Sequence, residues 1–201
     1  MKPSPHWAFE AYQRIRFRLP ELVSETVTPQ QVPSLEAISD RFDGFIFDAF
    51  GVLNAGNNAL PTAVARFHDL QSMGKHCLVL SNAASAPQKE LVRKYRNLGF
   101  PITPDQLISS RMLMSDALAS EPERTWAIMA PTSAHTDQLP CRGFIIGDLK
   151  AKANRERLDN ADAIVMLNAR GWTRELQQCL VDSLHHRPRH GVFRKTLQQC
   201  L

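Results

Sequence analysis

The chain has 201 residues, of which 43% are hydrophobic, and 24 basic and 20 acidic residues give it a formal net charge of +4. This length and apolar content predict a buried core in one domain or two small ones, and no stretch is apolar enough to cross a membrane or to act as a signal peptide. The basic stretches at 14–18 and 185–190 carry no aromatic pattern. We therefore expect them to be solvated surface and the protein to be cytoplasmic, without a nucleic-acid partner.

Residues 1–20 place aromatic and aliphatic side chains at helical spacing before Pro20, which predicts an amphipathic helix: Trp7, Phe9, Tyr12, Ile15 and Leu19. A polar linker that contains proline follows, up to Pro33. We assign residues 1–33 to this helix and linker. Ser34 is expected to cap a short helix over residues 35–41.

A carboxylate follows the apolar run Phe45–Phe47, which reads as a short buried strand. Asp48 comes directly after this run, and the turn that follows contains Gly51. In open α/β sheets, ligands bind at the carboxyl ends of the strands, so Asp48 is a candidate functional residue. On these residues alone, the alternative that Asp48 only turns or caps the chain stays open.

The next segment predicts a helix and a second strand. The helix has Pro61 in its first turn and Gly74 just past its end, and the apolar run 77–80 ends in Ser81-Asn82. This strand–helix–strand order is typical of a parallel crossover. Asp48 and Ser81 are therefore expected to lie at the same edge of the sheet.

Another helix and a third strand follow. Ser85 and Gln88 have the spacing of a capping box for a helix that ends at Gly99, and residues 106–108 predict a third strand. Ser109 or Ser110 is expected to cap a further helix that runs to Leu118. The free N–H groups at the start of the helix that follows Ser85 favour an anion near Ser81.

The segment Asp48-Ala49-Phe50-Gly51-Val52-Leu53 resembles the first motif of the haloacid dehalogenase superfamily, Asp-x-Asp-Gly-Val/Thr-Leu. Phe50 replaces the second Asp of this pattern. An aromatic residue at this position is similar to a branch of class IIA, which includes 4-nitrophenyl and phosphoglycolate phosphatases. Ser81-Asn82 resembles the second motif of that class. The resemblance implies an α/β fold whose core is a Rossmann-like parallel sheet.

The resemblance also implies a function and a site. Asp48 would attack a phosphoryl group, while Ser81, Asn82 and Gly51 would bind the phosphate. Asp48 and the backbone carbonyl of Phe50 would hold Mg²⁺, and the substrate would be a small phosphorylated metabolite. Phe50 cannot do the acid–base work of the missing Asp, a role worth typically ~10²–10⁴-fold in rate.

Residues 121–201 predict strands at 126–129, 143–146 and 163–167, and a helix at 173–184. By resemblance, we assign residues 34–120 to the front of the core and 121–201 to a small α/β cap and a basic tail. In a rival interpretation, Gly147-Asp148 is the fourth motif of the superfamily. The absence of an acid at 149–154 argues against that interpretation.

Under the cap interpretation, the motif lysine and the C-terminal acids of the superfamily are missing, as are the last strands of the core. We therefore expect a truncated or frame-shifted hydrolase. The alternatives are a catalytically inactive binding protein on the same fold, or a fragment without independent function. An unpaired sheet edge would then remain. Because such an edge can pair with another chain, a homodimer is a further alternative.

Overall fold

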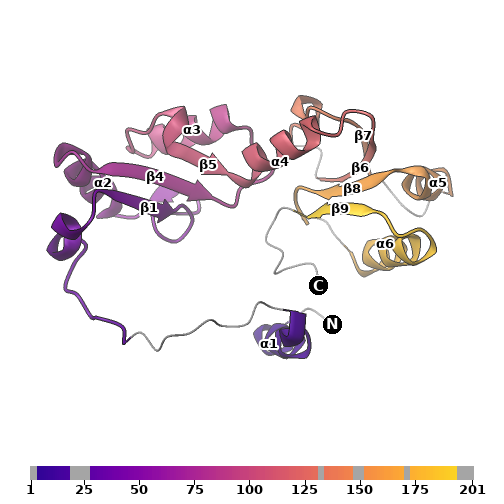
Figure 1. The fold of residues 1–201 in the computed structure, drawn as a ribbon, viewed down its shortest axis with the longest axis horizontal. Coiled ribbons are helices and arrows are strands. Elements are labelled where there is room, and N and C mark those ends of the chain that lie inside the picture. The colour runs from indigo at the N-terminus through magenta and orange to yellow at the C-terminus, as the bar shows by residue number, and fades with distance from the viewer. Residues whose placement is uncertain (1–3, 19–27, 131–133, 147–151, 170–172, 194–201) are drawn as a thin grey trace.

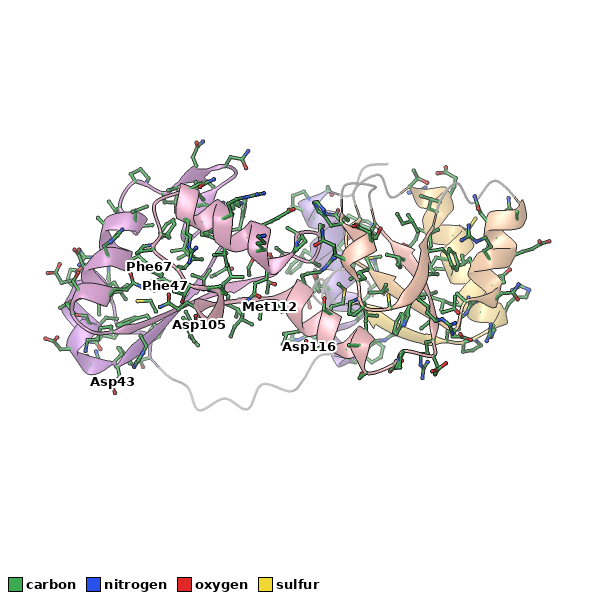
Figure 2. All side chains as sticks on the ribbon, turned by 90° about the horizontal axis from the view of Figure 1, so that it is seen from above. Asp43, Phe47, Phe67, Asp105, Met112 and Asp116 are labelled. Atoms are coloured by element: carbon green, nitrogen blue, oxygen red, sulfur yellow. The ribbon has the colours of Figure 1, made fainter. Side chains whose placement is uncertain are left out.

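The computed structural model describes residues 4–18, 28–130, 134–146, 152–169 and 173–193. Two parallel sheets stand next to each other along the long axis of the molecule (Figure 1). Helix α4 (Ser110–Ala119) connects them, and in Figure 2 its residues Met112 and Asp116 lie between the two sheets. The chain is therefore a mixed α/β protein with a Rossmann-like parallel core, as predicted.

The first sheet contains β1 (Gly44–Asp48), β4 (His76–Ser81) and β5 (Leu107–Ser109) in the order β1-β4-β5. Helix α2 (Ala63–Ser72) links β1 to β4, and α3 (Gln88–Asn97) links β4 to β5. All pairings are parallel, with Asp48 opposite Leu80 and Ser81 opposite Ser109. The predicted crossover is therefore confirmed.

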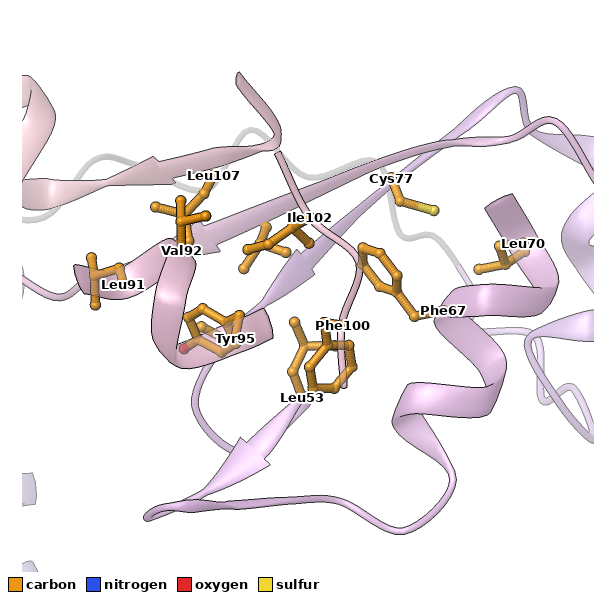
Figure 3. Close-up of a cluster of buried hydrophobic side chains, with 12 residues drawn as sticks. Leu53, Phe67, Leu70, Cys77, Leu91, Val92, Tyr95, Phe100, Ile102 and Leu107 are labelled. Carbon is orange, nitrogen blue, oxygen red and sulfur yellow. The ribbon is translucent and has the colours of Figure 1, made fainter. Parts of the chain in front are cut away.

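The core of this first unit lies between the sheet and helices α2 and α3 (Figure 3). The ring of Phe47, which β1 directs inward, lies 5.4 Å from that of Phe67 of α2 at a tilt of 46°, and the Phe67 ring packs edge-on against that of Phe100 at 5.6 Å. Aromatic packing of this kind adds to the burial of apolar area. These contacts fix β1 against α2 and so fix the strand end that carries Asp48.

The opposite face of the first sheet is open. Ile46 is 70% exposed between two half-buried residues of β1, and Leu80 is 49% exposed between two buried residues of β4. Parallel sheets normally carry helices on both faces. Among the described residues, helices cover only one face of this sheet.

The second sheet contains β6 (Thr125–Met129), β7 (Arg142–Ile145), β8 (Ala163–Met166) and β9 (His190–Phe193), in the order β7-β6-β8-β9. Helices α5 (Lys152–Asn160) and α6 (Arg174–His186) accompany it. Trp126 and Ile128 pack into one cluster, and Ala127 and Met129 into another. Because β6 alternates between two clusters, it is buried on both faces.

The N-terminal region is less regular than predicted. Helix α1 spans only Pro5–Arg14, where the Trp7 N–H donates to the Ser4 hydroxyl at 3.1 Å, and a 3₁₀ turn, η1, covers Arg16–Arg18. Residues 19–27 lie outside the described part. The short helix before β1 is a 3₁₀ helix, η2 (Glu36–Arg41), and Ser34 accepts from the Ala37 N–H at 3.3 Å. Leu35 is the N-cap of this helix, one residue later than predicted, although the Ser34 hydroxyl still accepts a hydrogen bond from its first turn.

The predicted capping box at Ser85 is wrong. Helix α3 begins at Gln88 with Pro87 as its N-cap, and no side chain caps it. The Ser85 hydroxyl instead accepts from Asn168 Nδ2 at 2.9 Å, and Gln88 Nε2 donates to the Pro104 carbonyl at 2.8 Å. Tertiary partners have replaced the local bonds that the spacing suggested.

The expectation of solvated surface for residues 185–190 is wrong for Arg189. Its side chain is 2% exposed, and it donates to the Leu158 carbonyl and, at 2.7 Å, to the Ser183 carbonyl. His190 begins strand β9. The residues of the rival fourth motif, Gly147-Asp148, lie outside the described part of the chain. None of the described helices is long and apolar enough to span a membrane.

Candidate active site

Asp48 is the last residue of β1, at the carboxyl edge of the first sheet, and its side chain is exposed. The Ala49 N–H donates both to Asp48 Oδ1 at 2.7 Å and to the Leu80 carbonyl at 3.1 Å. One carboxylate oxygen is therefore held by the backbone of the next residue. The exposed carboxylate remains accessible to a ligand at the strand end.

The turn after Asp48 depends on Gly51, which has a φ of +93°. A Cβ at this position would meet no atom within 4 Å, so the requirement for glycine comes from the backbone conformation. The Gly51 N–H donates to the Asn54 carbonyl at 2.8 Å, and the Leu53 N–H donates to the Ala49 carbonyl at 3.0 Å. The turn therefore folds back beside Asp48 and leads into the hairpin of β2 (Asn54–Ala55) and β3 (Asn58–Ala59).

Ser81 ends β4 at the same edge of the sheet. Its side chain is buried, and its hydroxyl accepts from the Ala83 N–H at 3.2 Å, while Asn82 between them is exposed. Leu80, the residue before Ser81, pairs with Asp48. The fold thus brings Asp48 and Gly51 of the first motif to the same sheet edge as Ser81 and Asn82 of the second, which follow at least thirty positions later in the chain.

Tyr95 is a residue near this site that the two motifs do not include. Its hydroxyl donates to Asn54 Oδ1 at 3.2 Å, and Asn54 Nδ2 donates to the Gly56 carbonyl at 2.7 Å. Burial raises the pKa of the Tyr95 hydroxyl, a hydrogen bond with Ser81 lowers it, and the charge of Asp48 raises it. A buried tyrosine hydroxyl needs a polar partner, and this signal could have pointed to the site.

The oxygen donors here fit part of a magnesium site. Carboxylate and carbonyl oxygens, as Asp48 and Phe50 would offer, are ligands that Mg²⁺ accepts in its octahedral shell. Within the described ranges, no cluster of three or more His, Cys, Asp or Glu side chains could hold a metal ion. If Asp48 and Phe50 hold Mg²⁺, the remaining ligand positions of the ion would therefore go to water and to the phosphate.

A surface hollow of the first unit lies elsewhere. It is lined by the end of α3 and the segment before β5: Arg96, Gly99, Phe100, Pro101, Ile102 and Thr103. These residues stand at the amino ends of the parallel strands, whereas Asp48 and Ser81 stand at the carboxyl ends. The hollow is thus separate from the candidate site.

The family profile described as "Haloacid dehalogenase-like hydrolase" matches residues 45–144, which include both motifs and the first sheet. The chain belongs to this family. The match confirms the resemblance to the haloacid dehalogenase superfamily that was drawn from the two motifs.

Among curated proteins, the chain is similar to a chloroplastic phosphoglycolate phosphatase 1A of Arabidopsis thaliana, at 22% identity over 54% of this chain and 31% of that protein. Among solved structures, it is similar to a possible sugar phosphatase of Cytophaga hutchinsonii, with a TM-score of 0.67 and 23% identity over 81% of this chain and 58% of that one.

A glycerol phosphate phosphatase of Mycobacterium tuberculosis in complex with magnesium gives a TM-score of 0.51 at 18% identity, over 75% of this chain and 43% of that one. At these identities the structures establish the fold alone. The chain spans about a third of the curated relative and just over half of the Cytophaga protein.

Proposed function

We propose that the chain carries the phosphate site of a Mg²⁺-dependent phosphomonoester hydrolase that works through an aspartyl-phosphate on Asp48. The observation that carries the proposal is the convergence of an accessible carboxylate, a glycine turn and a Ser-Asn pair at one edge of a parallel sheet. Chemistry in this family is largely positioning and charge stabilisation, which such an edge can provide.

The proposed reaction has two steps. An oxygen of the Asp48 carboxylate attacks phosphorus, the ester P–O bond breaks, and the leaving oxygen takes a proton from water. A second water then attacks the phosphorus of the aspartyl-phosphate, which releases inorganic phosphate and restores the carboxylate. The Ala49 N–H holds Oδ1, so Oδ2 is the oxygen we assign to the attack.

Other residues of this chain would orient the phosphate. The Ser81 hydroxyl and the Asn82 side chain would donate to phosphoryl oxygens, and the turn at Gly51 would let the backbone approach them closely. When bound between Asp48 and the Phe50 carbonyl, Mg²⁺ would neutralise the charge of the phosphate. Phe50 offers no proton, so water must serve both steps.

We take a small phosphorylated metabolite as the substrate class, because relatives are named for phosphoglycolate and glycerol phosphate. A cytoplasmic location is part of the same proposal and rests on the sequence expectation. A second candidate function is phosphate binding without turnover. The exposed phenyl ring of Phe50, in place of an acid–base group, favours it.

Hydrolysis of 4-nitrophenyl phosphate with Mg²⁺ tests the proposal. We expect turnover by the unmodified chain and its loss, by about 10³-fold or more, in Asp48→Asn, because the amide cannot attack phosphorus. Asp43→Asn is the matched control, since Asp43 directly precedes the amino end of the same strand. If the folded chain shows no turnover that depends on Asp48, the proposed hydrolysis fails, and phosphate binding without turnover remains as its function.

A further inference from the structure

Arg111, in the first turn of α4, is a charged side chain buried between the two sheets, with 3% of its surface exposed. Its Nη1 donates to the Ala84 carbonyl at 3.3 Å and to the Ala134 carbonyl at 3.1 Å, and its Nη2 donates to the His135 carbonyl at 2.7 Å. One guanidinium therefore joins the loop after β4 to the segment after β6.

Backbone carbonyls, rather than a carboxylate, solvate this buried charge. No described carboxylate forms an ion pair with Arg111. Burial lowers the pKa of the guanidinium, against the charges of Asp137, Cys141 and Glu90, which raise it. Because a guanidinium keeps its charge and its fixed fork of donors even when buried, it can hold three carbonyls in one geometry.

The loop that Arg111 holds is the one that follows Ser81. The Arg111 backbone N–H also donates to the Ala83 carbonyl at 3.1 Å. The main chain and the side chain of Arg111 therefore hydrogen-bond to adjacent residues of this loop. From the other sheet, Asn168 Nδ2 donates to Ser85 Oγ at 2.9 Å. Residues 83–85 of the loop thus have partners outside it, while Asn82 stays exposed.

The segment on the far side of Arg111 is also constrained. His135 has a φ of +46°, a left-handed conformation that residues other than glycine adopt rarely. Its carbonyl accepts from Arg111, and its ring Nε2 lies 3.3 Å from Glu90 of α3. A backbone conformation of this kind persists where its surroundings fix it.

We propose that Arg111 is a positioning residue that holds the Ser81–Ala84 loop in its phosphate-receiving conformation by pinning it to residues 134–135, which lie between β6 and β7. The inference rests on the proposed function of that loop. It assigns the second sheet a part in forming the phosphate site, through a residue that touches neither substrate nor metal.

Two measurements on Arg111→Met test this: amide hydrogen exchange in residues 82–85, and the affinity for inorganic phosphate with Mg²⁺. We expect exchange about tenfold faster and phosphate binding about tenfold weaker. Arg111→Lys should recover part of both. Arg96→Met is the matched control, because Arg96 Nε also donates to a carbonyl, that of Ile102, at 2.8 Å, but away from the loop; it should change neither.

A folded Arg111→Met chain with unchanged loop exchange and unchanged phosphate affinity overturns the proposal. If that variant does not fold, Arg111→Lys decides, and wild-type values for both quantities overturn it. If the unmodified chain does not bind phosphate, the proposed function of the loop fails. Faster loop exchange in the variants would then still support the pinning by Arg111, and unchanged exchange would overturn it.

Discussion

Phe50 stands where the family pattern has a second aspartate, and its side chain is 65% exposed. An exposed ring contributes little to the core, so its replacement has a small structural cost. Its backbone is fixed by the turn, in which Phe50 forms a bridge with Asn54. The position can therefore accept an acid without rebuilding the site.

Phe50→Asp should raise the turnover of 4-nitrophenyl phosphate, by up to about 10²-fold, because the new carboxyl can protonate the leaving oxygen and activate water. The gain should appear in kcat. Phe50→Asn is the control, since it has the same shape without the acid. Equal rates for the two variants would contradict the assigned geometry.

Tyr95 predicts a pH dependence of stability. Its pKa is raised in the folded protein from an ordinary value of 10.0, so the folded state binds the proton more tightly than the unfolded state. The resulting stabilisation is complete below pH 10.0 and is lost as pH rises through the folded pKa. Tyr95→Phe should lack this alkaline loss.

Urea unfolding from neutral to alkaline pH measures the effect. At neutral pH, Tyr95→Phe should be less stable by about 1 kcal/mol, because Asn54 loses a buried hydrogen-bond donor. That difference should shrink at alkaline pH. The thiols of Cys77 and Cys141, whose pKa values burial also raises, are present in both chains and cancel. A constant difference across the pH range would argue against the role given to Tyr95.

At the scale of elements, β1 is a strand that contains no fully buried residue. It forms one edge of the first sheet, and Ile46 lies on the face that none of the described helices covers. An open edge and an apolar face together favour pairing with another chain. We therefore expect the chain to self-associate through this strand.

Sedimentation velocity tests this expectation with two variants of β1. Ile46→Lys should weaken self-association and change the free energy of unfolding by less than about 0.5 kcal/mol, because the side chain is exposed. Phe47→Ala, the adjacent residue, which packs against Phe67, should instead lower stability by about 2 kcal/mol. Undiminished self-association in Ile46→Lys would place the contact elsewhere.

The sequence predicted the elements whose signals are local. Periodicity and strand-end glycines located β1, α2 and β4, and hence the shared edge of Asp48 and Ser81. Side chains with distant partners were not predictable in this way: Ser85 bonds to Asn168, 83 positions away, and Arg189 bonds to Leu158, 31 positions away. The spacing to Gln88 predicted Ser85 as a helix cap, and the basic stretch around Arg189 predicted solvated surface.

At the scale of the whole molecule, the two sheets meet at the loop that follows Ser81. At this loop, the side chains of Arg111 and Asn168 form hydrogen bonds that join the two units. The candidate site residues from the two motifs all belong to the first sheet and its loops, whereas the contacts of Arg111 and Asn168 come from outside that sheet. The two motifs predicted the candidate site, but the contacts that join its loop to the rest of the molecule depend on the packing of the two units and could not be predicted from them.

The most direct test of the account is to trap the phosphorylated form of Asp48. The chain is mixed with 4-nitrophenyl phosphate and Mg²⁺, quenched and treated with sodium borohydride, which reduces an aspartyl-phosphate to homoserine, and its peptides are then sequenced by mass spectrometry. Because Phe50 cannot activate water, the intermediate should accumulate. We predict homoserine at position 48 and none at position 43, whereas a chain that turns over substrate with unmodified Asp48 would contradict the assignment of the nucleophile.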